Sequence, residues 1–329
     1  MTRALVLLRR RLIAAIPVLL IVAVGAFLLL ELAEGDAVDA YLAESGGGDP
    51  ALIAELRRQW GLDGSPLARL WIFLSSVITG DLGWSVLFNR PVLDVILERL
   101  PNTLLLMGSA TALAFALGSA LGIVAGSRPG SGADRALSIA SLALYAIPSF
   151  WLGLVLIVVF SVELRWLPLG GIETIASGKA GLDRALDIAR HLVLPVLALG
   201  LIYFALYLRV MRAGMTEVWR SDFVLAARAR GIPRRRIVLR HVARNALLPL
   251  VTMLGLQSAT MLGGSVVVES VFAIPGLGRL AQEAVAARDT PLLLGVVLAS
   301  AVMVILVNLL VDIAYALLDP RVGASEAGA

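Results

Sequence analysis

The stretch SDFVLAARARGIPRRRIVLRHVARNALLP, residues 221–249, decides how the rest of this 329-residue chain is interpreted. It is a long polar interruption in a sequence that is 59% hydrophobic and only 16% charged. Soluble domains are about half apolar and about one quarter charged. The composition therefore predicts an all-α integral membrane protein, and residues 221–249 form its most elaborate polar loop.

Helix signals in this loop define a short basic segment. Ser221 and Asp222 predict the start of a helix over 223–230, because short polar side chains favour N-cap positions. Gly231 supplies the left-handed residue that ends such a helix, and Pro233 prevents its continuation. The chain then re-enters an apolar segment, so we expect this helix to lie across the membrane surface.

Apolar segments long enough to cross a bilayer, which takes about 20 residues, occur six times. They divide the chain into an N-terminus with the first span, an extramembrane helical region, and a core of five spans with one long polar loop. The spans are 12–30, 103–126, 136–161, 192–208, 246–268 and 292–310; the three parts are 1–32, 33–100 and 101–329, with the loop at 211–246.

The distribution of basic residues fixes the expected orientation, because cytoplasmic loops hold the excess of Lys and Arg. With both termini inside, the inner segments carry 17 of the 28 basic residues. We therefore expect a multi-pass membrane protein with both termini and residues 221–249 in the cytoplasm. The first apolar run exceeds a signal-peptide core and has no Ala-x-Ala site, so we expect no cleavage.

The region between the first two spans, residues 33–100, faces outward in this topology. Prolines favour the first helical position, and they predict helix starts at Pro50, Pro66 and Pro91. The run Leu70–Leu74 is too short to span and suits an interfacial helix. Two interpretations stay open for this region: a small cap packed on the bundle, and a docking surface for an external partner.

Small residues recur at four-residue spacing within two spans. Such spacing lets helix backbones approach closely in lipid, where no hydrophobic force drives helices together. It predicts tight packing of the second and fifth spans, in a compact bundle or at a dimer interface, through Gly118, Gly122 and Gly126, and through Gly255, Ala259 and Gly263.

Polar side chains within the spans are sparse, and such groups tend to face protein or a water-filled path. Gln257, Ser258, Ser149 and Asn308 are therefore candidates to line a substrate path. Asp312, one turn after Asn308 near the inner end of the last span, suits a capping role, with a proton or ion relay as the alternative.

Several chemistries have no signature in the sequence. Without cysteine, and with His191 and His241 lacking ligand partners at suitable spacing, we expect no metal site. There is no phosphate-binding loop, since Lys179 lacks the upstream glycine and the following hydroxyl residue. Both histidines lie outside the spans, so no nucleophile and base pair forms there, and we expect no enzyme.

Three interpretations compete for residues 221–249. A positive-inside loop touching anionic lipid needs only charge, and explains neither the cap nor the glycine stop. A helix offering Phe223 and the small pair Ala226 and Ala227 suits a groove on another protein. Nucleic-acid binding is disfavoured, because no aromatic residues interleave with the arginines.

These residues carry a family resemblance. The loop resembles the EAA loop of ABC-importer permeases, and its form is similar to the dipeptide, oligopeptide and nickel branch. Leu225 stands where the general motif has glutamate, and Glu34 replaces a frequent proline. The long outer segment resembles the B-type subunit. The matching motifs are Asp222-Phe223, Ala226–Gly231, Arg240-His241, Arg244–Pro249, Gly80–Ser85, Leu100–Thr103, Trp166–Pro168 with Gly170-Gly171, and Phe272–Gly278.

The resemblance implies a type I importer permease with six transmembrane helices, an extracytoplasmic helical insertion after the first, and a cytoplasmic coupling helix. It implies a second paralogous permease, two ATPase subunits from one or two gene products that use ATP-Mg, and an extracytoplasmic substrate-binding protein. The chain itself would bind no cofactor. The implied coupling residues are Asp222, Phe223, Ala226, Ala227, Arg230 and Gly231, and the implied outer gate loop holds Phe272, Pro275 and Gly276.

Di- and oligopeptides are the substrates that this branch implies first, with nickel chelates, opines and oligosaccharides as alternatives. A second class of function stays open. The polar residues within the spans, together with Asp312, also fit a self-contained channel or ion-coupled carrier that needs no ATPase.

Overall fold

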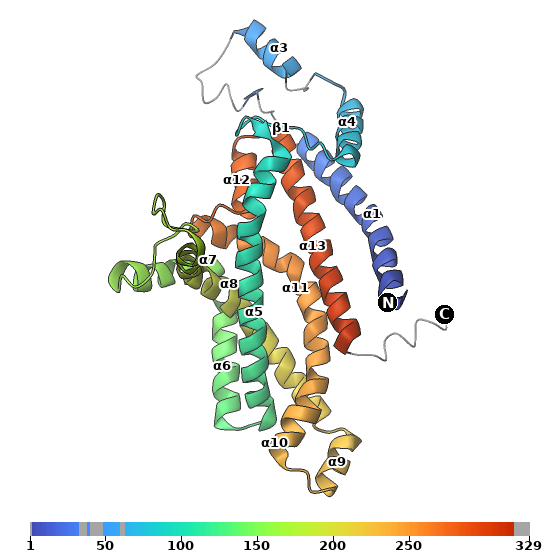
Figure 1. Cartoon of the computed structure of the whole chain (residues 1–329), viewed down its shortest axis with the longest axis vertical. Coiled ribbons are helices and arrows are strands. Elements are labelled where there is room, and N and C mark those ends of the chain that lie inside the picture. Colours follow the sequence, from blue (N-terminus) through green and yellow to red (C-terminus); the bar gives the residue numbers. More distant parts are fainter. Residues whose placement is uncertain (1, 33–37, 40–48, 60–62, 319–329) are drawn as a thin grey trace. The chain divides into compact units, whose positions relative to one another are not determined.

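Long helices make up most of the computed structural model, which describes residues 2–32, 38–39, 49–59 and 63–318 (Figure 1). The described residues fall into two compact units, one up to residue 103 together with 275–306, the other 104–274 together with 307–318. The elements are α1 (Thr2–Glu31), α3 (Pro50–Gln59), α4 (Pro66–Thr79), β1 (Trp84–Ser85), β2 (Arg90–Pro91), α5 (Val92–Ser127), α6 (Gly132–Ala146), α7 (Ser149–Leu156), the π-helix η1 (Ile157–Glu163), α8 (Gly181–Val218), α9 (Asp222–Ala229), α10 (Arg234–Arg236), the π-helix η2 (Ile237–Val242), α11 (Ala243–Val271), α12 (Leu277–Ala286) and α13 (Thr290–Leu318).

Within the described residues, five helical runs are long and apolar enough to cross a membrane; they lie in α1, α5, α8, the run from α10 into α11, and α13. The third predicted span, 136–161, is wrong as one straight helix. It is broken into two parts, α6 and the continuous run of α7 and η1, and the axis bends by 99° between these two parts. Pro148 has no N–H to donate and forces Ile147 into an extended conformation, with ψ 126°. Counted as one broken span, the pair brings the number of spans to six.

The first unit contains the predicted helix starts. α3 and α4 begin at Pro50 and Pro66, as predicted, and Pro91 directly precedes α5. The hairpin of β1 and β2 was not foreseen. It is held by Asp289, whose Oδ2 accepts hydrogen bonds from Ser85 Oγ at 2.7 Å and from the Leu87 N–H at 3.0 Å. The glycines at 46–48 predict a turn between the helices of this region, and Glu34 stands where the resemblance has a frequent proline; both places lie outside the described residues.

Residues of the Leu100–Thr103 motif fix the loop before α12 in the same unit. Asn102 Nδ2 donates to the Pro275 carbonyl at 2.7 Å, and the Leu277 N–H donates to Thr103 Oγ1 at 2.7 Å. Thr103 thereby satisfies an amide at the start of α12 that has no partner within the helix. The motif has a structural role here, joining segments more than 170 residues apart in sequence.

The second unit is built on close contact between α5 and α8. A Cβ atom added at Gly118, Gly122 or Gly126 would lie 2.5 to 2.6 Å from the Cβ of a residue on α8, so the helices can approach only because these positions are glycine. Packing through this glycine series is confirmed. The α8 residues facing the three glycines are Tyr207, Met211 and Met215, all fully buried.

The second predicted series, on α11, divides between two environments. A Cβ at Gly255 would lie 2.9 Å from Asn308 Oδ1, so Gly255 packs against α13. Ala259 is exposed, and nothing lies within 4 Å of a Cβ at Gly263. Close packing within the chain is therefore confirmed for Gly255, whereas Gly263 has no such contact within the described residues, and its packing at a dimer interface stays a prediction.

Candidate partner-binding site at α9

The helix α9 leaves the end of α8 after a short turn, at the end of the second unit where α5 turns into α6 (Figure 1). Ser221 occupies the N-cap position in an extended conformation, with ψ 147°. Its side chain makes no capping hydrogen bond, so this part of the prediction is wrong; the Val224 N–H donates to the Ser221 carbonyl at 3.0 Å instead. Asp222 places a negative charge in the first turn, where the helix dipole favours it.

The end of α9 follows the prediction. Gly231 has φ +70°, which is the left-handed conformation that costs glycine nothing. Its N–H donates to the Arg228 carbonyl at 2.9 Å, and the Ile232 N–H donates to the Ala227 carbonyl at 3.2 Å. These two bonds close the last turn, and Pro233 then begins the next one with φ −64°.

The two faces of α9 differ in environment. Val224 and Ala227 are buried, with 1% and 2% of their surface exposed, and they pack with Ile237, Val238 and the end of α8 in the largest apolar cluster of the second unit. Ala227 therefore supports the helix from within. The remaining predicted coupling residues are exposed: Asp222, Phe223, Ala226, Arg230 and Gly231.

Leu225, which sequence reasoning treated as a departure from a motif, belongs to the exposed face. It is 68% exposed, and Phe223 is 43% exposed, so two large apolar side chains project from a polar loop. The signal was present in the sequence, because Val224 and Ala227 are three residues apart and can share one buried side of a helix. An exposed apolar pair on a firmly packed helix is suited to a hydrophobic pocket on a partner.

Sequence reasoning also missed the role of Trp219. The guanidinium carbons of Arg228 and Arg234 lie 4.7 Å and 5.4 Å from the centroid of its ring. Arg234 also donates to the Ser127 carbonyl at 2.6 Å, at the C-terminus of α5. These contacts join α9 and α10 to α8 and α5.

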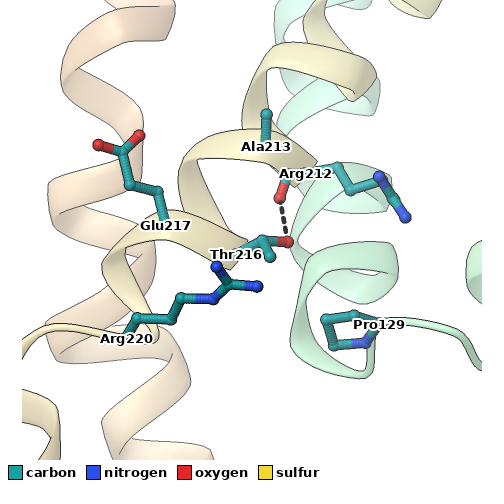
Figure 2. Close-up of a pocket in the computed structure, with 6 residues that line it drawn as sticks. All are labelled: Pro129, Arg212, Ala213, Thr216, Glu217 and Arg220. Carbon is teal, nitrogen blue, oxygen red and sulfur yellow. Dashed lines mark hydrogen bonds between the residues drawn. The ribbon is translucent and has the colours of Figure 1, made fainter.

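A buried ion pair lies at the same end of the unit. Asp134, 2% exposed, accepts hydrogen bonds from the Arg212 guanidinium and from the Gly130 N–H, the latter at 2.8 Å. Beside it, a cavity of about 500 Å³ is lined by one acidic and one basic residue, Glu217 and Arg220 (Figure 2). With Arg212 already paired, the lining carries no excess charge. The other lining residues are Pro129, Ala213 and Thr216.

The predicted substrate-path residues do not form one cluster. Gln257 is half-buried on α11, and its Oε1 accepts from Thr260 Oγ1 at 2.7 Å. Asn308 packs against Gly255, two positions before Gln257 and hence on a different side of α11. Ser149 is half-buried at the start of α7, and the side chain of Ser258 lies outside the described part of the structure.

The predicted outer gate loop is buried at Phe272, which is 1% exposed. In the second unit the Phe272 carbonyl accepts from the Gly171 N–H at 2.8 Å, and a Cβ at Gly170 would lie 2.5 Å from that oxygen. The paired glycines of that motif thus permit a close approach of backbone to backbone. In the first unit Pro275 is half-buried, and Gly276 occupies the N-cap position of α12.

Charged residues before the apolar part of α8 hold the loop that precedes it. Asp187 accepts from Lys179 Nζ at 2.5 Å and from the Thr174 N–H at 2.6 Å. Asp187 also lies one turn before His191, with His191 Nδ1 3.8 Å from its Oδ2, so one carboxylate that the sequence analysis did not consider lies near His191. Arg184, by its hydrogen bond, lowers the pKa of Glu173 in the same loop. Among the described residues, no group of three or more such side chains could hold a metal ion.

Comparisons with known proteins agree with this architecture. Residues 118–324 match the family model described as binding-protein-dependent transport system inner membrane component, and residues 1–107 match the model of its N-terminal region. The chain is 37% identical over 318 residues to the oligopeptide transport system permease protein AppB of Bacillus subtilis, covering 95% of this chain and 98% of that protein.

Two further similarities extend the comparison. The glutathione transport system permease protein GsiC of Pectobacterium atrosepticum is 40% identical, over 95% of this chain and 97% of that protein. A solved structure of the MetNI methionine ABC transporter in an inward-facing conformation has a TM-score of 0.53 at 18% identity, covering 69% of this chain and 97% of that chain, and shares its fold. On these grounds the chain belongs to the family of inner-membrane components of binding-protein-dependent transport systems.

Proposed function

We propose that this chain is the transmembrane permease subunit of an ATP-driven importer of di- and oligopeptides. The substrate class is supported by the relatives, since AppB is named for oligopeptide transport, GsiC for glutathione, itself a small peptide, and a Brucella ovis relative as a putative peptide permease. Nickel chelates, opines and oligosaccharides are alternatives for the same machinery.

The observation that carries this proposal is the structure of α9, which buries Val224 and Ala227 and exposes the apolar side chains of Phe223 and Leu225. The sequence of the chain has no nucleotide-binding loop. Energy for import must then come from elsewhere. ATP-Mg would be used by two separate ATPase subunits, from one or two gene products, and the exposed face formed by Asp222, Phe223, Leu225, Ala226 and Arg230 would seat in a cleft on one of them. Residues 222–231 would move with that subunit when it closes on ATP.

A second permease and a path between the two are supported by the exposed face of α11. The exposed residues of α13 are aliphatic, as contact with lipid requires: Val302, Leu306, Leu310 and Ile313. From residue 252 onward, the described exposed residues of α11 follow one helical stripe and are mostly small or polar: Thr252, Leu256, Ala259, Thr260, Gly263, Val267 and Ser270. The hydroxyl groups of Thr252, Thr260 and Ser270 donate to carbonyls of their own helix, and in contact with hydrocarbon their remaining hydrogen-bonding capacity would stay unused. This stripe would therefore face a paralogous permease or the water-filled path, with Gln257 at its edge.

The topology completes the proposal. The excess of arginine on the α9 side supports a cytoplasmic position for that end and for both termini, in a bacterial inner membrane. The opposite end would then receive substrate from an extracytoplasmic binding protein, near the predicted gate residues Phe272, Pro275 and Gly276. Transport would consist of a rigid-body switch between inward-facing and outward-facing states.

Reconstitution tests this function. Proteoliposomes containing this chain, its paralogous permease, the ATPase subunits and the binding protein should accumulate a labelled tripeptide only with ATP-Mg. Liposomes that lack the ATPase subunits are the matched control and should show no uptake. Gradient-driven flux in the control, abolished by Asp312→Asn, would replace the importer by an ion-coupled carrier.

A further inference from the structure

Trp219 is the one aromatic side chain in the described part of the α9 region that contacts two cations at once. Arg228, in the last turn of α9, lies 4.7 Å from its ring centroid, and Arg234, the first residue of α10, lies at 5.4 Å. Both distances are within the range of cation–π attraction, which is about 6 Å. One ring thus holds both sides of the turn that contains Gly231.

The ring and its partners are anchored to separate helices. Trp219 directly follows α8 and is half-buried against the apolar cluster that includes Val224 and Ala227. Arg234 also donates to the carbonyl of Ser127, the last residue of α5. A cation is favourable at this place, because the unpaired carbonyls at a helix C-terminus carry partial negative charge.

Neighbouring arginines set this arrangement apart from a merely basic loop. Residues 220–244 are all described, and within them Arg235 and Arg236 are exposed and make no ring contact. A positive charge that only fixed topology would act equally well at any of these positions. The contacts of Arg228 and Arg234 depend on their place beside Trp219.

We propose that Trp219 is a positioning residue for energy coupling, acting as a clamp through Arg228 and Arg234 that keeps α9 rigidly attached to α8 and α5. The inference rests on the proposed function of α9. Without the clamp, a pull on the exposed face of α9 would bend the turns at 219–221 and 230–233 before it moved a spanning helix. With it, displacement of α9 carries the cytoplasmic ends of α8 and α5 along.

Substitution in the complete reconstituted importer tests the clamp. Trp219→Leu removes the aromatic face while remaining apolar, and it should lower the amount of peptide imported per ATP hydrolysed. Losing two cation–π contacts should shift α9 toward a loosened state by roughly five- to thirtyfold. Trp219→Phe keeps an aromatic face and should restore most of the ratio. Arg228→Gln should lower the ratio as well, whereas Arg235→Gln, which removes the same charge nearby, should not.

A distance measurement distinguishes positioning from general damage. The chain has no cysteine, so spin labels can be placed cleanly at Ala229→Cys on α9 and Arg135→Cys on α6, both exposed. Double electron–electron resonance in the complete importer should give a narrow distribution of the distance between the two labels when they are placed in the parent chain or in Trp219→Phe, and a broad one in Trp219→Leu. An unchanged ratio, or a lower ratio without broadening, would overturn the clamp.

The coupling role of α9 itself is tested separately by Leu225→Glu, which alters the exposed face and leaves the clamp in place. If Leu225→Glu lowers the ratio and Trp219→Leu does not, the clamp is wrong and the coupling role stands. If neither change lowers it, the coupling role fails, and an unchanged distance distribution then excludes the clamp as well.

Discussion

A single methyl group should distinguish two glycines on the same helix. A Cβ at Gly122 would lie 2.6 Å from the Cβ of Met211 and 3.0 Å from the Leu208 carbonyl, whereas a Cβ at Gly108 meets nothing within 4 Å. Gly122→Ala should therefore destabilise the protein by about 1–3 kcal/mol through overpacking. Gly108→Ala, the matched control on α5, should be neutral or stabilise by up to about 1 kcal/mol. Thermal unfolding of the purified protein in detergent measures both, and equal melting temperatures would show that α5 and α8 are not in close contact.

At the same scale, the spacing of small residues predicts that they share one helix face, but it does not predict which element, if any, packs against that face. Gly118, Gly122 and Gly126 are buried against α8, while Ala259 and Gly263, in the same register on α11, remain open. Ala226 and Ala227 show the same limit, because only the contacts with η2 and α8 decide that Ala227 is the inward one. Sequence supplies the candidates, and long-range packing selects among them.

Adjacent residues on α9 should respond to substitution in opposite ways. Leu225 is 68% exposed, so Leu225→Glu should leave the melting temperature unchanged and reduce co-purification of the ATPase subunits, because a carboxylate enters an apolar contact. Val224 is 1% exposed, so Val224→Ala should cost about 1–3 kcal/mol and leave co-purification intact. Affinity purification and thermal unfolding in parallel give both results. Loss of ATPase binding in Val224→Ala alone would place the contact elsewhere.

At the scale of whole elements, hydropathy located the apolar runs but predicted neither the length of the helices that contain them nor a bend within one of them. The run at 192–208 became a 38-residue helix, because amphipathic turns such as the one around Asp187 extend it without adding hydropathy. The run at 136–161 is broken at Pro148, where the helix axis bends by 99°. Hydropathy summed along a segment carries no information about the direction of the helix axis, so it could not predict this bend. The caps were readable locally: Gly231 adopts φ +70°, and α3 and α4 begin at their prolines.

For the molecule as a whole, sequence motifs identified the family but did not predict the long-range hydrogen bonds that their residues make. Thr103 meets Leu277, and Asp289 meets Ser85, across more than 170 positions of sequence. Asp134 and Arg212 are 78 positions apart, and no local sequence pattern links them. Such pairs arise from how helices pack, which one sequence does not encode in any local pattern, so the buried polar network could not be predicted.

The charge pattern along α8 supports the proposed orientation of the chain. Its residues 191–208 contain no Asp, Glu, Lys or Arg, and 18 helical residues rise about 27 Å, close to the thickness of a bilayer core of about 30 Å. Charged groups begin immediately on either side, at Arg190 and Arg209. We therefore expect the two ends of α8 to emerge on opposite sides of the membrane, with the arginine-rich end in the cytoplasm.

Single cysteines in this cysteine-free chain can test that orientation directly. Ile175 is 92% exposed in the loop before α8, and Ala229 is exposed on α9 beyond its other end. Ile175→Cys should react with a membrane-impermeant maleimide on intact spheroplasts, and Ala229→Cys should react only in inside-out vesicles. The parent chain provides the background, since it has no thiol to label. Labelling of both cysteines from one side would mean that α8 does not cross the bilayer, and α9 would then lose the cytoplasmic position on which its contact with an ATPase depends.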